Sequence, residues 1–111
     1  VPVAIADAGT HVGKLVGLEF TPGRISKMPS GALWYLNSAA DYRDENNVAV
    51  VVNAEVQRKF RQAGVADFDA FEERYRGRQV RVQGVITLYR GKPQLMLDDP
   101  SALEVLPDAE P

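Results

Sequence analysis

Hydrophobic residues alternate with polar or small ones along several short stretches of the chain, which is the pattern of half-buried β-strands. In the first of these stretches Val16, Leu18 and Phe20 stand at every second position. Patterns of this kind predict five strands, at residues 14–28, 32–37, 48–52, 80–88 and 93–97. Residues 103–106 allow a further short closing strand.

Two of these strand segments contain residues that bend or turn the chain. Pro22 and Gly23 interrupt the first strand and predict a bend or bulge between residues 14–20 and 24–28. Gly91 follows Arg90 between two strand patterns and predicts a hairpin, because glycine readily takes a positive φ.

The hydrophobic period changes in the middle of the chain. Val56, Phe60 and Ala63 follow each other at spacings of four and three, which marks one face of a helix that Asn53 would cap. A second short helix is expected over residues 67–75. The phenylalanines are assigned to the core: Phe20, Phe60, Phe68 and Phe71.

The order of these elements predicts a mainly β fold, a five-stranded Greek-key barrel of the OB type with one or two helices between strands three and four. Gly17 and Gly84 fall inside strands, where glycine gives a strongly coiled strand room to bend. An open α+β sheet with a helix on one face is the alternative. Residues 10–106 form the predicted domain, between a flexible segment at 1–9 and an acidic tail at 107–111.

Composition fits one small globular domain and excludes several kinds of chemistry. The chain has 111 residues, of which 45% are hydrophobic and 25% charged. No apolar run approaches the length of a membrane-spanning helix. The absence of cysteine excludes disulfides and thiolate chemistry, and a single histidine excludes a multi-histidine metal site.

Charge is unevenly distributed, although the formal net charge is only −2. Residues 74–97 contain basic side chains and no acidic ones, whereas residues 98–111 contain acidic side chains and no basic ones. Because the guanidinium fork matches phosphate oxygens, this favours a surface for single-stranded nucleic acid or another polyanion. A solvated face, or a set of partners for the acidic tail, is the alternative. The acidic pI of about 5.3 counts against a dedicated nucleic-acid domain.

Aromatic side chains beside cations are the second feature of single-strand binding, because bases stack on them. Tyr89 lies at the predicted hairpin and Tyr42 in the long polar loop. Trp34 and Tyr35 are neighbours on one strand, so one points inward and the other outward, and the sequence leaves open which. The candidate nucleic-acid-binding residues are Tyr35, Tyr42, Arg43, Arg76, Arg78, Arg81, Tyr89, Arg90 and Lys92.

No arrangement of residues indicates catalysis, and we expect no catalytic residue, metal or cofactor. The acidic loop at 41–47 lacks the ligand order of a calcium loop. Asp98 and Asp99 are adjacent, and adjacent strand residues face opposite ways. The serines lie outside any nucleophile-elbow pattern, and there is no phosphate-binding glycine loop.

Part of the sequence resembles a known group. Residues 75–84, 88–95 and 98–101, which include Tyr89-Arg90-Gly91-Lys92-Pro93-Gln94, resemble the second half of bacterial OB-fold nucleic-acid-binding domains. The segments at 11–14, 36–38 and 41–43 are similar to small, often exported members of that group. The resemblance spans roughly residues 10–106 and implies an OB-type fold and a nucleic-acid ligand, DNA included.

The leading hypothesis is a non-catalytic OB-fold module that binds single-stranded nucleic acid. The alternative is an exported OB-like module that binds a protein or a small ligand, or has a structural role, without affinity for nucleic acid. No signal-peptide pattern is present, but the chain begins at Val1 without methionine, so a periplasmic or secreted location stays open. The sequence does not fix the ligand or the oligomeric state.

Overall fold

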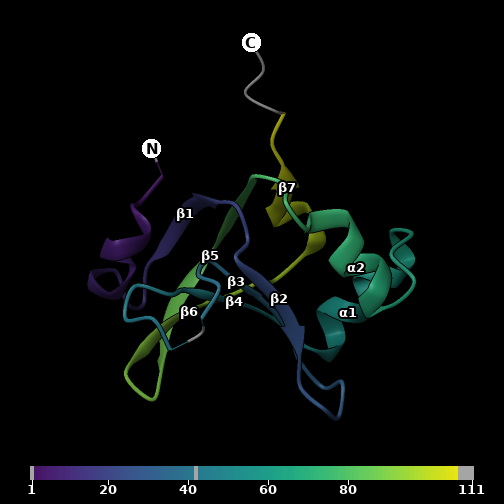
Figure 1. Cartoon of the computed structure of the whole chain (residues 1–111), viewed down its shortest axis with the longest axis horizontal. Coiled ribbons are helices and arrows are strands. Elements are labelled where there is room, and N and C mark those ends of the chain that lie inside the picture. The colour runs from purple at the N-terminus through teal and green to yellow at the C-terminus, as the bar shows by residue number, and fades with distance from the viewer. Residues whose placement is uncertain (1, 42, 108–111) are drawn as a thin grey trace.

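A single sheet of seven strands dominates the computed structural model, which describes residues 2–41 and 43–107 (Figure 1). The strands are β1 (Leu15–Phe20), β2 (Arg24–Lys27), β3 (Trp34–Asn37), β4 (Ala49–Val52), β5 (Val80–Tyr89), β6 (Lys92–Met96) and β7 (Leu103–Val105). Two α-helices, α1 (Ala54–Gln62) and α2 (Phe68–Tyr75), connect β4 to β5. Short 3₁₀ helices, η1 (Ile5–Thr10) and η2 (Pro100–Ala102), precede β1 and β7.

The strand order forces the sheet to curl. Neighbouring strands follow the order β1-β5-β6-β4-β3-β2, and β7 pairs with the free part of β5. In a flat sheet the two end strands of this six-strand path would lie about 24 Å apart. They are consecutive in the chain, however, and the four residue steps from Phe20 to Arg24 span at most about 14 Å. The sheet therefore wraps back on itself and encloses one of its faces.

Two details of the predicted barrel are wrong. The sheet has seven strands instead of five, because the first predicted strand is divided into β1 and β2 and because β7 is added at the end. The sheet is also not closed by hydrogen bonds, since β1 and β2 share no pairing in the described residues. The interruption falls at Pro22, which has no backbone N–H to donate to a ladder.

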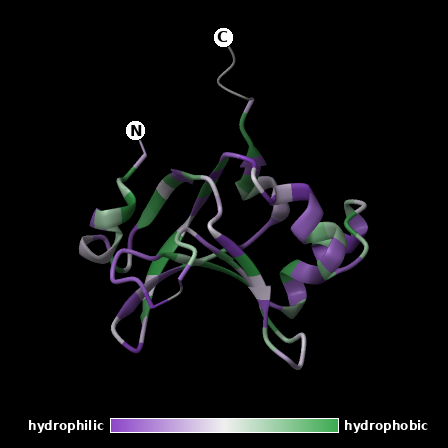
Figure 2. Cartoon of the chain, viewed as in Figure 1, coloured by the Kyte–Doolittle hydropathy of each residue, from purple (hydrophilic) through white to green (hydrophobic). Residues whose placement is uncertain are grey.

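The enclosed face holds the hydrophobic core. One row across the sheet joins Ile25, Leu36, Val50, Leu95 and Ile86 through successive strand pairs. All of these except the partly buried Ile25 have no exposed surface. In Figure 2 both hydrophobic and hydrophilic colours appear along the strands and on the two helices, as expected of elements with one buried face.

Both helices pack at one end of the sheet through a group of rings that we call the aromatic cluster: Trp34, Phe60, Phe68, Phe71 and Tyr75. The Trp34 and Phe71 ring centroids are 5.0 Å apart, and those of Phe60 and Phe71 are 5.3 Å apart with the rings nearly perpendicular. Such tilted and edge-on contacts suit the aromatic quadrupole. The cluster shows that Trp34 points inward, which the sequence left open.

Local sequence signals for the helices and the hairpin are confirmed. Asn53 caps α1, since its side chain accepts a hydrogen bond from the Val56 N–H. The chain reverses between β5 and β6 through Arg90 at φ 53° and Gly91 at φ 79°, the combination of a type I′ turn. Gly84 serves a close approach between β5 and β6, because a Cβ there would lie 2.4 Å from the Leu95 side chain.

Residues 2–9, which belong to the predicted flexible segment, contact the domain. They hold most of η1, place Ala8 in the core, and bond to β1 through Val3 N–H and the Gly17 carbonyl at 2.8 Å. Of the predicted acidic tail at 107–111, only Pro107 lies within the described residues.

Candidate functional site

Several polar residues lie on the outer face of the sheet, directly opposite the core. They stand at alternate strand positions, so Arg24, Asn37, Ala49 and Gln94 form one cross-strand row over β2, β3, β4 and β6. Ala49 is the small residue within this row and leaves space between its larger neighbours. Polar, cationic and aromatic side chains border that space.

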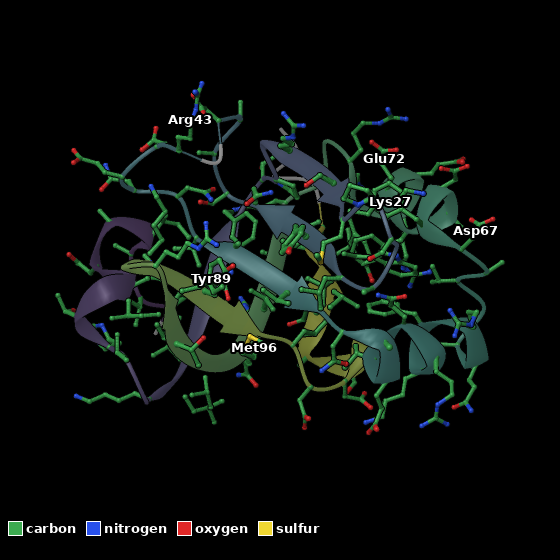
Figure 3. All side chains as sticks on the ribbon, turned by 90° about the horizontal axis from the view of Figure 1, so that it is seen from below. Lys27, Arg43, Asp67, Glu72, Tyr89 and Met96 are labelled. Carbon is green, nitrogen blue, oxygen red and sulfur yellow. The ribbon has the colours of Figure 1, made fainter. Side chains whose placement is uncertain are left out.

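The space is a cleft of about 450 Å³. The β5–β6 hairpin borders one side and β2 the other. In Figure 3, Tyr89 lies on the hairpin side and Lys27 on the β2 side towards α2. The residues that line the cleft are Arg24, Ser26, Lys27, Tyr35, Asn37, Asn47, Ala49, Tyr89, Arg90, Lys92, Pro93 and Gln94.

The cleft is electropositive, because the described residues that line it include four cations and no carboxylate. Arg24 makes no ion pair with any described residue. Arg90 lies over the Tyr89 ring at 5.3 Å, and Lys27 over the Phe68 ring at 5.3 Å. Contacts with rings do not neutralise these charges. The Asp41 carboxylate interacts electrostatically with Lys92, but it also pairs with Arg43, so the cleft keeps a positive charge and attracts anions.

The loop at 38–47 borders the cleft and is fastened at its base. Asn47 accepts a hydrogen bond from the Ala39 N–H at 2.9 Å and donates one to Asn37 at 3.0 Å. Gly23, in the bend between β1 and β2, touches the same base, because a Cβ there would lie 2.5 Å from Ala39 and Ala40 backbone atoms. This position needs glycine for that close approach.

The outer part of the loop meets the hairpin. The Lys92 ammonium donates a hydrogen bond to the Arg43 carbonyl at 3.0 Å. The Arg43 side chain pairs with Asp41 at 3.1 Å, and hydrogen bonds from Arg43 hold the pKa of Asp41 below its usual value. The two segments therefore contact each other at the rim of the cleft, with Arg43 further out, as Figure 3 shows.

Four of the predicted site residues line the cleft together: Tyr35, Tyr89, Arg90 and Lys92. Arg43 lies next to them through its contact with Lys92. Tyr42 lies outside the described residues. Tyr35 is the outward-facing partner of Trp34, and Tyr89 is 55% exposed, so a planar ligand has access to its ring.

The structure does not bring Arg76, Arg78 and Arg81 into this group. Arg81 is held between Glu19 on β1, at 2.8 Å, and Glu104 on β7, at 3.4 Å. The hydrogen bond to Glu19, more than any other contact, raises the pKa of Arg81. Arg78 borders a separate open hollow with Glu73 in its lining, and Arg76 follows α2 outside the cleft.

Sequence reasoning missed the parts of the cleft that β2 and β4 provide, and on β3 and β6 it found only Tyr35 and Lys92. A usable signal existed in β2 and β3, where Arg24 and Ser26 flank Ile25, and Tyr35 and Asn37 flank Leu36. These polar positions oppose the core positions on the same strands. The residues that were not proposed are Arg24, Ser26, Lys27, Asn37, Asn47, Ala49, Pro93 and Gln94.

The described residues hold no metal-binding cluster and no membrane-spanning helix. Within residues 2–41 and 43–107, no group of three or more histidine, cysteine, aspartate or glutamate side chains is placed to hold a metal ion. In the same part of the chain, neither helix has the length and apolar surface needed to cross a membrane.

Comparison with known proteins gives structural neighbours alone. No protein-family model matches the sequence, and no curated protein is similar enough to match it. The OBody AM1L10, solved bound to hen egg-white lysozyme, is 16% identical with a TM-score of 0.63, over 94% of this chain and 91% of its own. The OBody AM3L09, also bound to hen egg-white lysozyme, is 16% identical with a TM-score of 0.64, over 96% and 95%.

A tRNA synthetase is similar over part of its length. The asparaginyl-tRNA synthetase from Pyrococcus horikoshii is 20% identical with a TM-score of 0.62, over 95% of this chain and 23% of the synthetase chain. This chain therefore spans about a quarter of that enzyme. At these identities the likeness shows the fold, which is mainly β and OB-like.

Proposed function

We propose that this protein is a non-catalytic OB-fold module that binds single-stranded nucleic acid in the cleft. The observation that carries the proposal is that four cations and two tyrosines share one cleft without a lining carboxylate among the described residues. Cations attract the phosphate backbone, and exposed rings provide stacking surfaces for bases.

The position of the cleft supports the same proposal. OB folds bind oligonucleotides and oligosaccharides on the face of their central strands, between the loop of the first hairpin and that of the last. The cleft here lies on β2, β3, β4 and β6, beside the β5–β6 hairpin. Among the ligands of that face, a polyanion fits four lining cations without a lining carboxylate better than a neutral sugar does.

Fluorescence titration with a labelled single-stranded oligonucleotide of about 12 nucleotides tests the proposal. Because four cations line the cleft, a plot of log affinity against log salt has an expected slope of about −3. Replacing Arg90 and Lys92 together by glutamine should make that slope less steep by about 1.4.

Two further variants complete the experiment. Replacing Arg76 and Arg78 together by glutamine removes the same charge outside the cleft, so a slope change as large as that of the first pair would contradict the proposal. Ala49→Leu fills the base of the cleft without changing charge, and should weaken binding.

A second candidate function is recognition of a protein partner. It is favoured by two neighbours of nearly equal length, each solved bound to lysozyme, and by the exposed apolar pair Leu15 and Val85 on β1 and β5. No binding of the oligonucleotide at low salt would favour this function over the first. Salt-dependent binding that weakens when Arg90 and Lys92 are replaced by glutamine would favour nucleic-acid binding.

A further inference from the structure

One amide at the base of the cleft is held in a fixed orientation. The Ala39 backbone N–H can only donate, and it donates to Asn47 Oδ1 at 2.9 Å. The Ser38 hydroxyl accepts from the Val48 N–H at 2.9 Å and donates to the same oxygen at 3.4 Å. The Asn47 oxygen therefore faces Ala39, and its amide nitrogen must face the other way.

The orientation of the Asn47 amide also fixes that of the Asn37 amide. The Asn47 Nδ2 group donates to Asn37 Oδ1 at 3.0 Å, so the Asn37 oxygen is engaged. The Asn37 residue is only 4% exposed and lines the cleft. The Asn37 Nδ2 group has no hydrogen-bond partner among the described residues. Every fully buried side-chain nitrogen or oxygen in that part of the chain has a partner, so the Asn37 Nδ2 group is not fully buried and reaches solvent at the cleft. Asn37 thus presents a donor to the cleft, while its carbonyl oxygen is turned towards Asn47.

We infer that the cleft selects keto bases, namely uracil, thymine and guanine, over amino bases, with Asn37 as the specificity-determining residue; the inference rests on the proposed function. Uracil and thymine carry a carbonyl oxygen at the position where cytosine carries an amino group, and guanine differs from adenine in the same way. The Asn37 donor bonds to the carbonyl oxygen, whereas an amino group would set donor against donor.

Gln94 provides the internal comparison. It stands in the same cross-strand row as Asn37, with Ala49 between them, and it also lines the cleft. In the described part of the chain its side-chain amide has no hydrogen-bond partner to fix it, so it can turn to offer either its donor or its acceptor. Gln94 therefore contributes affinity without discriminating between keto and amino bases.

The test compares oligo(dU) with oligo(dC) of equal length at low salt. Both are pyrimidine strands. Uracil carries a keto oxygen where cytosine carries an amino group, and the adjoining ring nitrogen is protonated in uracil only. A neutral hydrogen bond predicts that the wild-type protein binds oligo(dU) about 2- to 10-fold more tightly. Asn37→Leu should bring the ratio of affinities close to one, and Gln94→Leu should leave it near the wild-type value.

Asn37→Asp sharpens the test, because it places an acceptor where the donor stands and should favour oligo(dC). Binding of both oligonucleotides with equal affinity to the wild-type protein overturns the inference without any variant, and so does a ratio unchanged by Asn37→Leu. Failure of both oligonucleotides to bind at low salt overturns the proposed function instead. Trp34 fluorescence verifies that each variant is folded, since this single tryptophan belongs to the aromatic cluster.

Discussion

The aromatic cluster and the cleft use the same residue types in different ways. Trp34 and Tyr35 are adjacent on β3, yet Trp34 packs against both helices while Tyr35 lines the cleft. Arg81 is held by two carboxylates, whereas Arg24 lines the cleft and makes no ion pair with a described residue. Side chains that satisfy one another stabilise the fold, and those left without partners are available to a ligand. Variants in the two regions should therefore separate stability from binding.

Phe71→Ala should produce the largest effect, on stability alone. Phe71 is completely buried and contacts four other rings of the aromatic cluster. Removing a buried aromatic ring costs about 3–5 kcal/mol of unfolding free energy. Urea denaturation followed by Trp34 fluorescence measures this loss. A variant that stays folded should bind the oligonucleotide with wild-type affinity, and a selective loss of binding would break the separation between the two regions.

Tyr35→Ala should have the next largest effect, on binding. Stacking of one base on an aromatic ring contributes about 1–3 kcal/mol, so affinity should fall by about one to two orders of magnitude. Tyr35→Phe keeps the ring and should retain most of the affinity. If the two variants bind equally weakly, the hydroxyl group matters and stacking does not. Titration with a labelled single strand measures both.

Arg24→Gln and Arg81→Gln compare an arginine in the cleft with one held by carboxylates. Loss of the Arg24 charge should make the slope of log affinity against log salt less steep by about 0.7. Loss of the Arg81 charge should leave the salt dependence of binding unchanged and lower the urea midpoint slightly, because both of its ion pairs are partly exposed to solvent. Equal slopes for the two variants would remove the distinction between these arginines.

Asp41→Asn should have the smallest effect, visible only through its pH dependence. Because Arg43 lowers the pKa of Asp41 below 3.8, the ionised carboxylate stabilises the folded loop above that pH. This contribution disappears as the pH falls through the lowered pKa of the folded state. Urea midpoints of wild type and variant should therefore differ slightly near neutral pH and converge in acid, once the pH lies below the lowered pKa of the folded state. A difference that persists in acid would show that the carboxylate charge is not responsible.

Local signals in the sequence predicted most of the elements. The Asn53 cap, the hairpin glycine at 91 and the bend at Pro22 each act through neighbouring residues, so they can be recognised without knowing the fold. The same applies to the alternation that places Leu95 inside and Gln94 outside on β6.

The cleft could not be predicted in full, because it depends on pairings between distant segments. Ala49 and Gln94 are partners in the parallel pair β4–β6, and nothing local to either segment indicates this register. The opposite error concerns the arginines at 76, 78 and 81, which are close in sequence to each other but do not line the cleft. Basic residues that are close in the sequence are therefore not always close in the folded structure.

The contact of Gly23 with the base of the 38–47 loop has a consequence for natural variation. Because two backbone segments touch there without an intervening side chain, a methyl group at position 23 requires the chain at 39–40 to move. Homologous sequences should therefore change both segments together, with larger residues at 23 accompanied by insertions or deletions after Asn37. Such covariation would show that the bend after the first strand and the loop beside the cleft change together among homologous proteins.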